Sequence, residues 1–118
     1  MNTKGKKKLS IYCRPTVGDL TVEKQMEIGI KCAKRLNYSY EIFIDKGRSG
    51  NGLNRGRDRR EFFKLLSHSI SDGVSDIFIY NLDILSDSVQ SLARLWEIFS
   101  THNINIHTAE ISAKPSLR

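Results

Sequence analysis

The sequence predicts an α/β fold with three layers, in which helices flank a mostly parallel sheet of four to five strands. Two observations carry this prediction. Short apolar runs alternate with segments of helical periodicity, in the order β-α-β-α-β-α-β. The chain has 118 residues, of which 39% are hydrophobic and 27% are charged, as expected for one globular domain.

The first three elements are predicted before residue 45. An apolar run over 9–13 ends at an Arg-Pro pair, because proline cannot donate a backbone hydrogen bond to a sheet. A helix follows from Thr21, which can cap its first turn, to Asn37, which can end it. Residues 40–44 are aromatic and β-branched, which favours a second strand. The apolar residues at helical spacing in the helix are Val22, Met26, Ile30, Ala33 and Leu36.

A long loop and a second helix are predicted next. Residues 45–57 hold four glycines and little that is apolar except Leu53, and such a stretch in a small domain is typical of a functional loop or of disorder. A helix is predicted over 58–70. Its inward face is expected to consist of Phe62, Phe63, Leu65, Leu66 and Ile70.

Three more elements complete the prediction. An almost wholly apolar strand at 76–80 is expected to be buried on both faces, and a final strand covers 104–107. Between them lies a helix in which Trp96 is expected to belong to the core rather than to a stacking surface. The apolar residues of that helix are Val89, Leu92, Leu95, Trp96 and Phe99.

The loops at 14–19, 45–57 and 81–88 all follow strands. We therefore expect them to meet at one edge of the sheet, because sites in parallel sheets form at the carboxyl ends of the strands. The domain organisation predicted is a basic leader at 1–8, one domain at 9–110 and a tail at 111–118.

The positive charge is concentrated in the first half of the chain. Residues 1–60 carry 15 Lys and Arg against 6 Asp and Glu, whereas residues 61–118 carry 4 against 7. This balance suits contact with the phosphates of DNA, and the alternative is a solvated basic face that aids solubility. The cations that we expect to contact DNA are Arg48, Arg55, Arg57, Arg59 and Arg60.

Several classes of protein are disfavoured by what the sequence lacks. No apolar run reaches the roughly 18–20 residues of a membrane span, and the basic start leads into no signal peptide, so we expect a cytoplasmic protein without membrane contact. Cys13 and Cys32 form no Cys-x-x-Cys pair and are expected to be small buried hydrophobes. His68, His102 and His107 lack metal-ligand spacing, so no metal or cofactor is expected.

Three motifs follow the predicted strands. Residues 11–16, Ile-Tyr-Cys-Arg-Pro-Thr, are followed by Gln25. Residues 45–50, Asp-Lys-Gly-Arg-Ser-Gly, are followed by Arg55 and a helix. Residues 82–88 are Leu-Asp-Ile-Leu-Ser-Asp-Ser. In this order and spacing they resemble the resolvase/invertase family of serine site-specific recombinases, whose corresponding segments are Tyr-x-Arg-Val-Ser-Thr, Asp-x-Gly-x-Ser-Gly with a later Arg-Pro pair, and Leu-Asp-Arg-Leu-Ser-Arg-Ser.

The resemblance implies DNA strand exchange without a metal or nucleotide cofactor. A serine hydroxyl would attack a phosphodiester to form a covalent protein–DNA phosphoester, while arginines neutralise the transition state. The residues that match site positions, and would form the catalytic set, are Thr16, Arg14, Arg55, Asp83, Gln25 and Ser49. For Arg14 and Arg55 a structural role is an equal alternative, and for Gln25 and Asp83 hydrogen bonding to neighbouring loops is favoured.

The chain departs from the family pattern at the positions that matter most. Thr16 stands at the nucleophile position, where its extra methyl group crowds in-line attack, and Pro15 stiffens the same turn. Ile84 and Asp87 replace two arginines, and Gly56 replaces a proline. One arginine that stabilises a phosphoryl-transfer transition state contributes roughly 10³ to 10⁵ in rate. We therefore expect a catalytically impaired relative.

Three functional hypotheses stay open at this point. One is an active recombinase domain of a larger protein, and another is a degenerate relative that binds DNA or a protein partner, with a homodimer as one form. The third, an unrelated flavodoxin-like or receiver-like domain, is the weakest, because no Gly-rich loop or acidic cluster follows the first strand. In the resembled family a long dimerisation helix and a DNA-binding region follow this domain, and residues 1–118 contain no helix-turn-helix.

Overall fold

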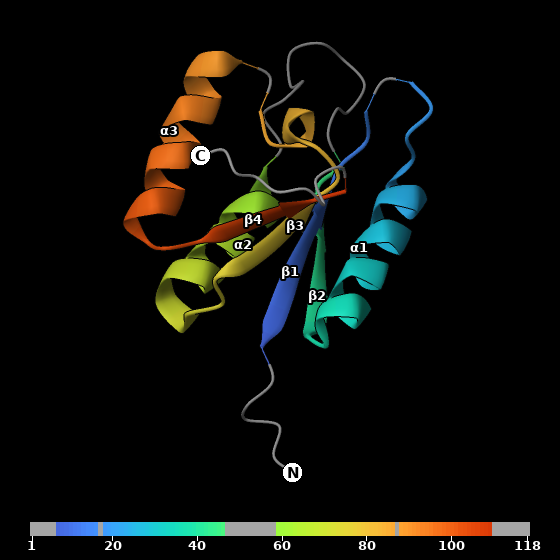
Figure 1. The fold of residues 1–118 in the computed structure, drawn as a ribbon. Coiled ribbons are helices and arrows are strands. Elements are labelled where there is room, and N and C mark those ends of the chain that lie inside the picture. Colours follow the sequence, from blue (N-terminus) through green and yellow to red (C-terminus); the bar gives the residue numbers. More distant parts are fainter. Residues whose placement is uncertain (1–6, 17, 47–58, 87, 110–118) are drawn as a thin grey trace.

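The computed structural model describes residues 7–16, 18–46, 59–86 and 88–109 (Figure 1). The elements, in chain order, are β1 (Lys8–Cys13), α1 (Val22–Leu36), β2 (Ser39–Ile44), α2 (Arg60–Asp72), β3 (Asp76–Ile79), the 3-10 helix η3 (Leu82–Ile84), α3 (Val89–Thr101) and β4 (Asn105–Thr108). The predicted order of strands and helices is therefore confirmed, with β1 starting one residue earlier than expected.

The sheet of the described part has four strands, in the order β2-β1-β3-β4, and every pair is parallel. Leu9 on β1 lies opposite both Tyr40 on β2 and Asp76 on β3. The chain winds from β1 to β2 in one direction and then crosses back to β3 on the other side of β1. The predicted parallel α/β class is thus confirmed, and the winding reverses between β1 and β3.

Two hydrophobic cores lie on the two faces of the sheet, because successive side chains of a strand point to opposite sides. Leu9 and Ile11 of β1 pack with Ala33 of α1 on one face. Tyr12 of β1 packs with Phe62 of α2 on the other face, where Phe99 of α3 also lies. One helix therefore covers one face and two helices cover the other, which confirms the three layers (Figure 1).

Helix α1 begins and ends where the sequence indicated. The Thr21 hydroxyl accepts a hydrogen bond from the backbone N–H of Lys24, and Asn37 ends the helix in the left-handed region with φ 64°. The side of α1 that packs on the sheet is not centred on the apolar stripe predicted from the sequence. Met26 and Ile30 of that predicted stripe are only half-buried. The fully buried stripe is Gln25, Gly29, Cys32 and Ala33.

Gly29 is the point of closest approach between α1 and the sheet. A Cβ atom at this position would lie 2.7 Å from Cγ2 of Ile11 and 3.0 Å from Cδ2 of Phe78. We expect Gly29→Ala to lower the free energy of unfolding by about 1–2 kcal/mol, because overpacking outweighs the helix propensity gained. Urea unfolding followed by circular dichroism measures this. A rise in stability of about 0.5–1 kcal/mol, as for Gly→Ala in an open helix, would contradict the close packing.

The inward face predicted for α2 is wrong at two positions. Phe63 is 62% exposed and Ile70 is 43% exposed. The helix buries the narrower stripe Phe62, Leu65 and Ser69, and each step of one residue turns a side chain by about 100° away from that stripe. The sequence places apolar residues on both sides of the stripe, so periodicity alone cannot select the buried ones.

The predicted core role of Trp96 is also wrong. Trp96 is 45% exposed and Val89 is 82% exposed, whereas Phe99 takes the buried position of α3. Trp96 rests with its ring edge-on to Phe99, at 5.6 Å between ring centroids. Within residues 7–16, 18–46, 59–86 and 88–109, no helix combines the length and apolar character needed to cross a membrane.

Candidate functional site

The carboxyl ends of the four strands, at Cys13, Ile44, Ile79 and Thr108, form one edge of the sheet, called here the carboxyl edge. Ligands of open parallel sheets bind outside this edge at the point where the winding reverses. In this chain that point lies between β1 and β3. The segments after these two strands carry Arg14, Thr16 and Asp83, so they adjoin the expected place for a site.

Gln25 fixes the backbone at the end of β1. Its side chain is fully buried, and its Oε1 accepts a hydrogen bond from the N–H of Arg14 at 3.2 Å while its Nε2 donates to the carbonyl of Arg14 at 2.8 Å. The amide thus binds both backbone groups of Arg14, as a residue of an antiparallel strand would. The helix α1 thereby sets the backbone position of Arg14.

The Arg14 side chain points inward. It is only 8% exposed, and its Nη1 lies 3.5 Å from the carbonyl oxygen of Ile84, a weak hydrogen bond by distance. This guanidinium therefore lies under the turn that follows β3. The structure assigns it a contact within the protein, while the phosphate contact expected from the resemblance stays a prediction.

Asp45 organises the end of β2 and the start of α2. Its Oδ2 accepts a hydrogen bond from the hydroxyl of Tyr12 at 2.6 Å and one from the N–H of Phe62 at 3.2 Å, and its Oδ1 accepts from the N–H of Glu61 at 2.8 Å. Arg59, the N-cap residue of α2, makes no capping hydrogen bond with its side chain. Asp45, which directly follows β2, caps the helix in its place.

Tyr12 is the buried donor of this cluster. Burial and the hydrogen bond with Asp45 raise the pKa of Tyr12 far above its ordinary value, although Arg59 opposes the shift. The hydroxyl consequently stays protonated and donates to Asp45. Nothing in this arrangement generates a tyrosinate nucleophile.

Arg59 crosses from the start of α2 to the turn after β3. Its Nη2 donates to the carbonyl of Leu85 at 2.7 Å, and its Nε donates to the Tyr12 hydroxyl at 3.3 Å. The family pattern places its Arg-Pro pair next to a helix, and α2 begins at Arg60. Arg59 rather than Arg55 therefore stands directly before the helix.

Thr16, at the nucleophile position, lies exposed two residues beyond Arg14. Its hydroxyl donates a hydrogen bond to the carbonyl of Leu20 at 3.1 Å, which closes the turn that leads into α1. The hydroxyl is accessible at the carboxyl edge. Within the described part of the chain, this hydroxyl makes no hydrogen bond to a basic group that could take its proton.

The turn after β3 presents Asp83 and hides Ile84. Asp83 is exposed, and its N–H is bound by Oδ1 of Asn81 at 3.1 Å. Ile84 is 1% exposed and belongs to the core that also contains Tyr12. The position at which the family has an arginine is thus an apolar core position here. Ser88 caps α3, since its hydroxyl accepts a hydrogen bond from the N–H of Ser91 at 3.1 Å.

Only part of the predicted site can be located. Thr16, Arg14, Gln25 and Asp83 lie after or beside the neighbouring strands β1 and β3, and the exposed side chain of Arg60 lies at the start of α2. The predicted convergence of Thr16, Arg55 and Asp83 therefore stays a prediction. The positions that fall outside the described residues are Arg48, Ser49, Arg55, Arg57 and Asp87.

Sequence reasoning missed Tyr12 and Asp45 as members of this cluster. Two features of the sequence could have indicated them: Asp45 stands at the end of a strand, and the next helix has an arginine at its N-cap. Such a helix needs an acceptor from elsewhere, because its first N–H groups have no partner within the helix. Sequence alone does not say which acidic residue supplies it.

The opposite edge of the sheet carries a separate polar cluster. Nε2 of His107 lies 2.9 Å from Oδ1 of Asp76, and Nδ2 of Asn105 lies 3.2 Å from the same oxygen. Burial alone would raise the pKa of Asp76, but these hydrogen bonds outweigh burial and hold the pKa below its usual value. The cluster joins β3 to β4, and we assign it a structural role.

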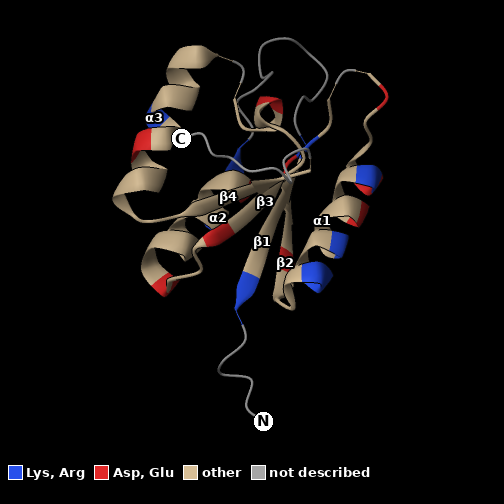
Figure 2. Ribbon diagram, viewed as in Figure 1, with Lys and Arg blue, Asp and Glu red and all other residues tan. Residues whose placement is uncertain are grey.

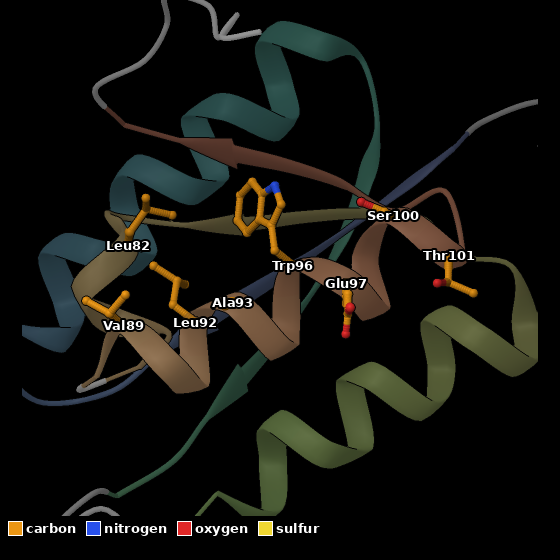
Figure 3. Close-up of a pocket in the computed structure, with 8 residues that line it drawn as sticks. All are labelled: Leu82, Val89, Leu92, Ala93, Trp96, Glu97, Ser100 and Thr101. Atoms are coloured by element: carbon orange, nitrogen blue, oxygen red, sulfur yellow. The ribbon is translucent and has the colours of Figure 1, made fainter.

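Two surfaces of the described part lie away from the carboxyl edge, one along α3 and one on α1. A groove of about 620 Å³ along α3 is lined mainly by apolar side chains, with Leu82 and Val89 at one end and Trp96 in the middle (Figure 3). Its charged residue is Glu97, so it does not suit a phosphate. In Figure 2 the Lys and Arg of α1 lie on the exposed side of that helix.

Neither cysteine of the chain is placed for reactivity or for metal binding. Cys13 and Cys32 are free and buried, as predicted, and burial raises the pKa of the Cys13 thiol to about 12, so it is unreactive at neutral pH. Across the described residues, no group of three or more His, Cys, Asp or Glu side chains is placed to hold a metal ion.

Comparison with known proteins identifies the family. Residues 9–116 match the family model described as "Resolvase, N terminal domain". The structure is similar to the N-terminal catalytic domain of TP901-1 integrase, with 25% identity and a TM-score of 0.68 over 87% of this chain and 77% of that one. No curated protein matches the sequence.

Two further solved structures share the fold. A resolvase family site-specific recombinase from Streptococcus pneumoniae has 20% identity and a TM-score of 0.73, over 92% of this chain and 78% of that one. The C-terminal catalytic domain of ISC1926 TnpA, an IS607-like serine recombinase, has 23% identity and a TM-score of 0.65, over 86% and 70%. The family match over residues 9–116 shows that the chain belongs to the resolvase family and carries its N-terminal domain.

Proposed function

We propose that this domain contacts DNA phosphates at the carboxyl edge but is impaired in strand exchange. The observation that carries the proposal is the placement of Ile84. Its side chain is 1% exposed in the core, at a position where the family has an arginine, and its carbonyl accepts a hydrogen bond from Arg14. One cation is absent, and a second is directed into the protein.

The chemistry that is impaired is attack of a hydroxyl on a phosphodiester. The hydroxyl oxygen would form a bond to phosphorus, the bond from phosphorus to one bridging oxygen would break, and the hydroxyl proton would end on the released DNA strand. Charge develops on the phosphoryl oxygens, and guanidinium groups must already be in place to stabilise it. With Ile84 and Asp87 in place of arginines and a crowded Thr16, we expect no useful rate.

Covalent trapping tests the impairment. The chain is incubated with a pool of nicked suicide duplexes of randomised sequence, and adducts are separated on a denaturing gel. We expect no adduct from the native chain or from Thr16→Ser, because the serine restores the nucleophile but not the arginines. An adduct from the native chain that disappears in Thr16→Ala would overturn the proposal, and an adduct only in Thr16→Ser would limit the defect to the nucleophile.

The DNA contact is tested by the salt dependence of binding. Binding of a short duplex should be weak, non-specific and steeply reduced between about 50 and 200 mM salt. Arg55→Ala with Arg57→Ala should lower the slope of log K against log salt by about 2, since each lost phosphate contact contributes about 0.9. The control Arg94→Gln removes an exposed cation from α3 and should leave the slope unchanged. An unchanged slope in the double variant would exclude the basic loop as the contact surface.

A further inference from the structure

The side chain of Arg59, at the carboxyl edge, makes two hydrogen bonds and contacts two aromatic rings. Its Nη2 donates to the carbonyl of Leu85 at 2.7 Å, and its Nε donates to the hydroxyl of Tyr12 at 3.3 Å. The first distance is that of a strong charge-assisted hydrogen bond. These two acceptors come from the turn after β3 and from β1, so one side chain of the α2 start joins three parts of the chain.

Two aromatic rings lie within cation–π distance of the same guanidinium. Its Cζ lies 4.8 Å from the centroid of the Phe62 ring and 5.7 Å from that of Tyr12. Phe62 is itself held by Asp45, which accepts the hydrogen bond of its backbone N–H. Only a planar group with several donors can contact both rings and both acceptors, so lysine is no equivalent here.

The carbonyl that Arg59 binds lies next to the one that Arg14 binds. Arg14 contacts the oxygen of Ile84 weakly, at 3.5 Å, and Arg59 binds that of Leu85 at 2.7 Å. Two guanidinium groups from different elements therefore meet consecutive peptide groups, and Arg59 makes the stronger of the two contacts. The turn itself is closed by the N–H groups of Ile84 and Leu85, which bind the carbonyls of Asn81 and Leu82. The exposed Asp83 is carried by this turn.

We infer that Arg59 is a positioning residue, whose guanidinium holds the turn with Asp83 against β1 and α2 instead of contacting phosphate itself. The positioning role itself does not depend on DNA binding. Only the expected effect of Arg59 variants on duplex binding rests on the proposed function. It predicts that Arg59, directly before the helix, keeps the turn in place at the carboxyl edge. Exposed cations such as Arg60 would instead provide the positive charge that contacts phosphate.

Amide hydrogen exchange tests the positioning role without DNA. In Arg59→Gln and in Arg59→Lys, exchange of the Ile84 and Leu85 N–H groups should rise roughly 10- to 100-fold, while the amides of β1 keep their protection. Arg60→Gln, on the neighbouring exposed residue, is the matched control and should change neither. Unchanged exchange in Arg59→Gln, full rescue by Arg59→Lys, or an equal rise throughout the sheet would overturn the inference.

Duplex binding provides a readout that loss of charge cannot imitate. Arg59→Gln and Arg59→Lys should weaken binding to a similar extent, and neither should change the salt slope, whereas Arg60→Gln should lower the slope by about 0.9. Native affinity in Arg59→Lys, or a slope lowered by about 0.9 in Arg59→Gln, would show a phosphate contact and overturn the inference. If the native chain binds no duplex, the proposed function fails, and the exchange result alone decides on Arg59.

Discussion

Asp45→Ala is expected to lower the free energy of unfolding by about 3 kcal/mol, and we expect one of the largest effects of a single substitution in this chain from it. The alanine leaves the buried hydroxyl of Tyr12 without its acceptor, which costs roughly 1–3 kcal/mol. It also leaves the N–H groups of Glu61 and Phe62 unbound at the start of α2, which adds about 1 kcal/mol for a lost cap. Urea unfolding of the native chain and the variant measures the difference.

A double-mutant cycle separates the two parts of this effect. Tyr12→Phe removes the hydroxyl and leaves Asp45 with its two backbone donors, so the loss should be smaller than in Asp45→Ala. In the Tyr12→Phe background, Asp45→Ala should cost only the cap, because no hydroxyl is left unpaired. Additive losses in the cycle would contradict the coupling between Tyr12 and Asp45 described above.

Gln25→Leu is expected to destabilise the fold by a comparable amount, about 2–4 kcal/mol. Leucine fills a similar volume but cannot bind either the N–H or the carbonyl of Arg14, and both groups are then buried without a partner. The loss falls at the end of β1, so the amides that follow Cys13 should also exchange faster than those in the middle of the strand.

The exposed Gln90 offers the control for this substitution. Gln90→Leu makes the same chemical change on the outer side of α3 and should alter stability by no more than about 0.5 kcal/mol. A loss in Gln25→Leu no greater than that in Gln90→Leu would mean that the paired amide is dispensable. The position would then be a spacer between α1 and β1.

The fold followed from the sequence because its signals are local. Thr21 and Asn37 mark the ends of α1 through interactions within one turn of the helix, and the structure confirms both. The alternation of apolar runs with helical segments left a parallel sheet as the simple solution. The rotation of each helix about its own axis depends instead on contacts with distant parts of the chain. Phe62 and Phe63 are equally apolar, and only packing against β1 selects the first.

The sequence predicted where the candidate site lies in the fold, but not which side chains contact one another there. Strand order and winding put the segments with Thr16 and Asp83 at neighbouring strand ends, as loops after parallel strands require. Whether an arginine faces outward or into the protein depends on the acceptors it meets. Arg14 and Arg59 meet carbonyls of residues that are far from them in sequence, and no periodicity reveals such acceptors.

The cap that Asp45 provides also determines how an anion can be bound at this edge. A free helix start attracts phosphate through the positive end of its macrodipole and its unpaired N–H groups. In α2 the carboxylate of Asp45 already occupies the N–H groups of Glu61 and Phe62. A DNA backbone that approaches there meets a helix start with these two N–H groups already bound, so the helix end attracts it less and lysine and arginine side chains must contribute more.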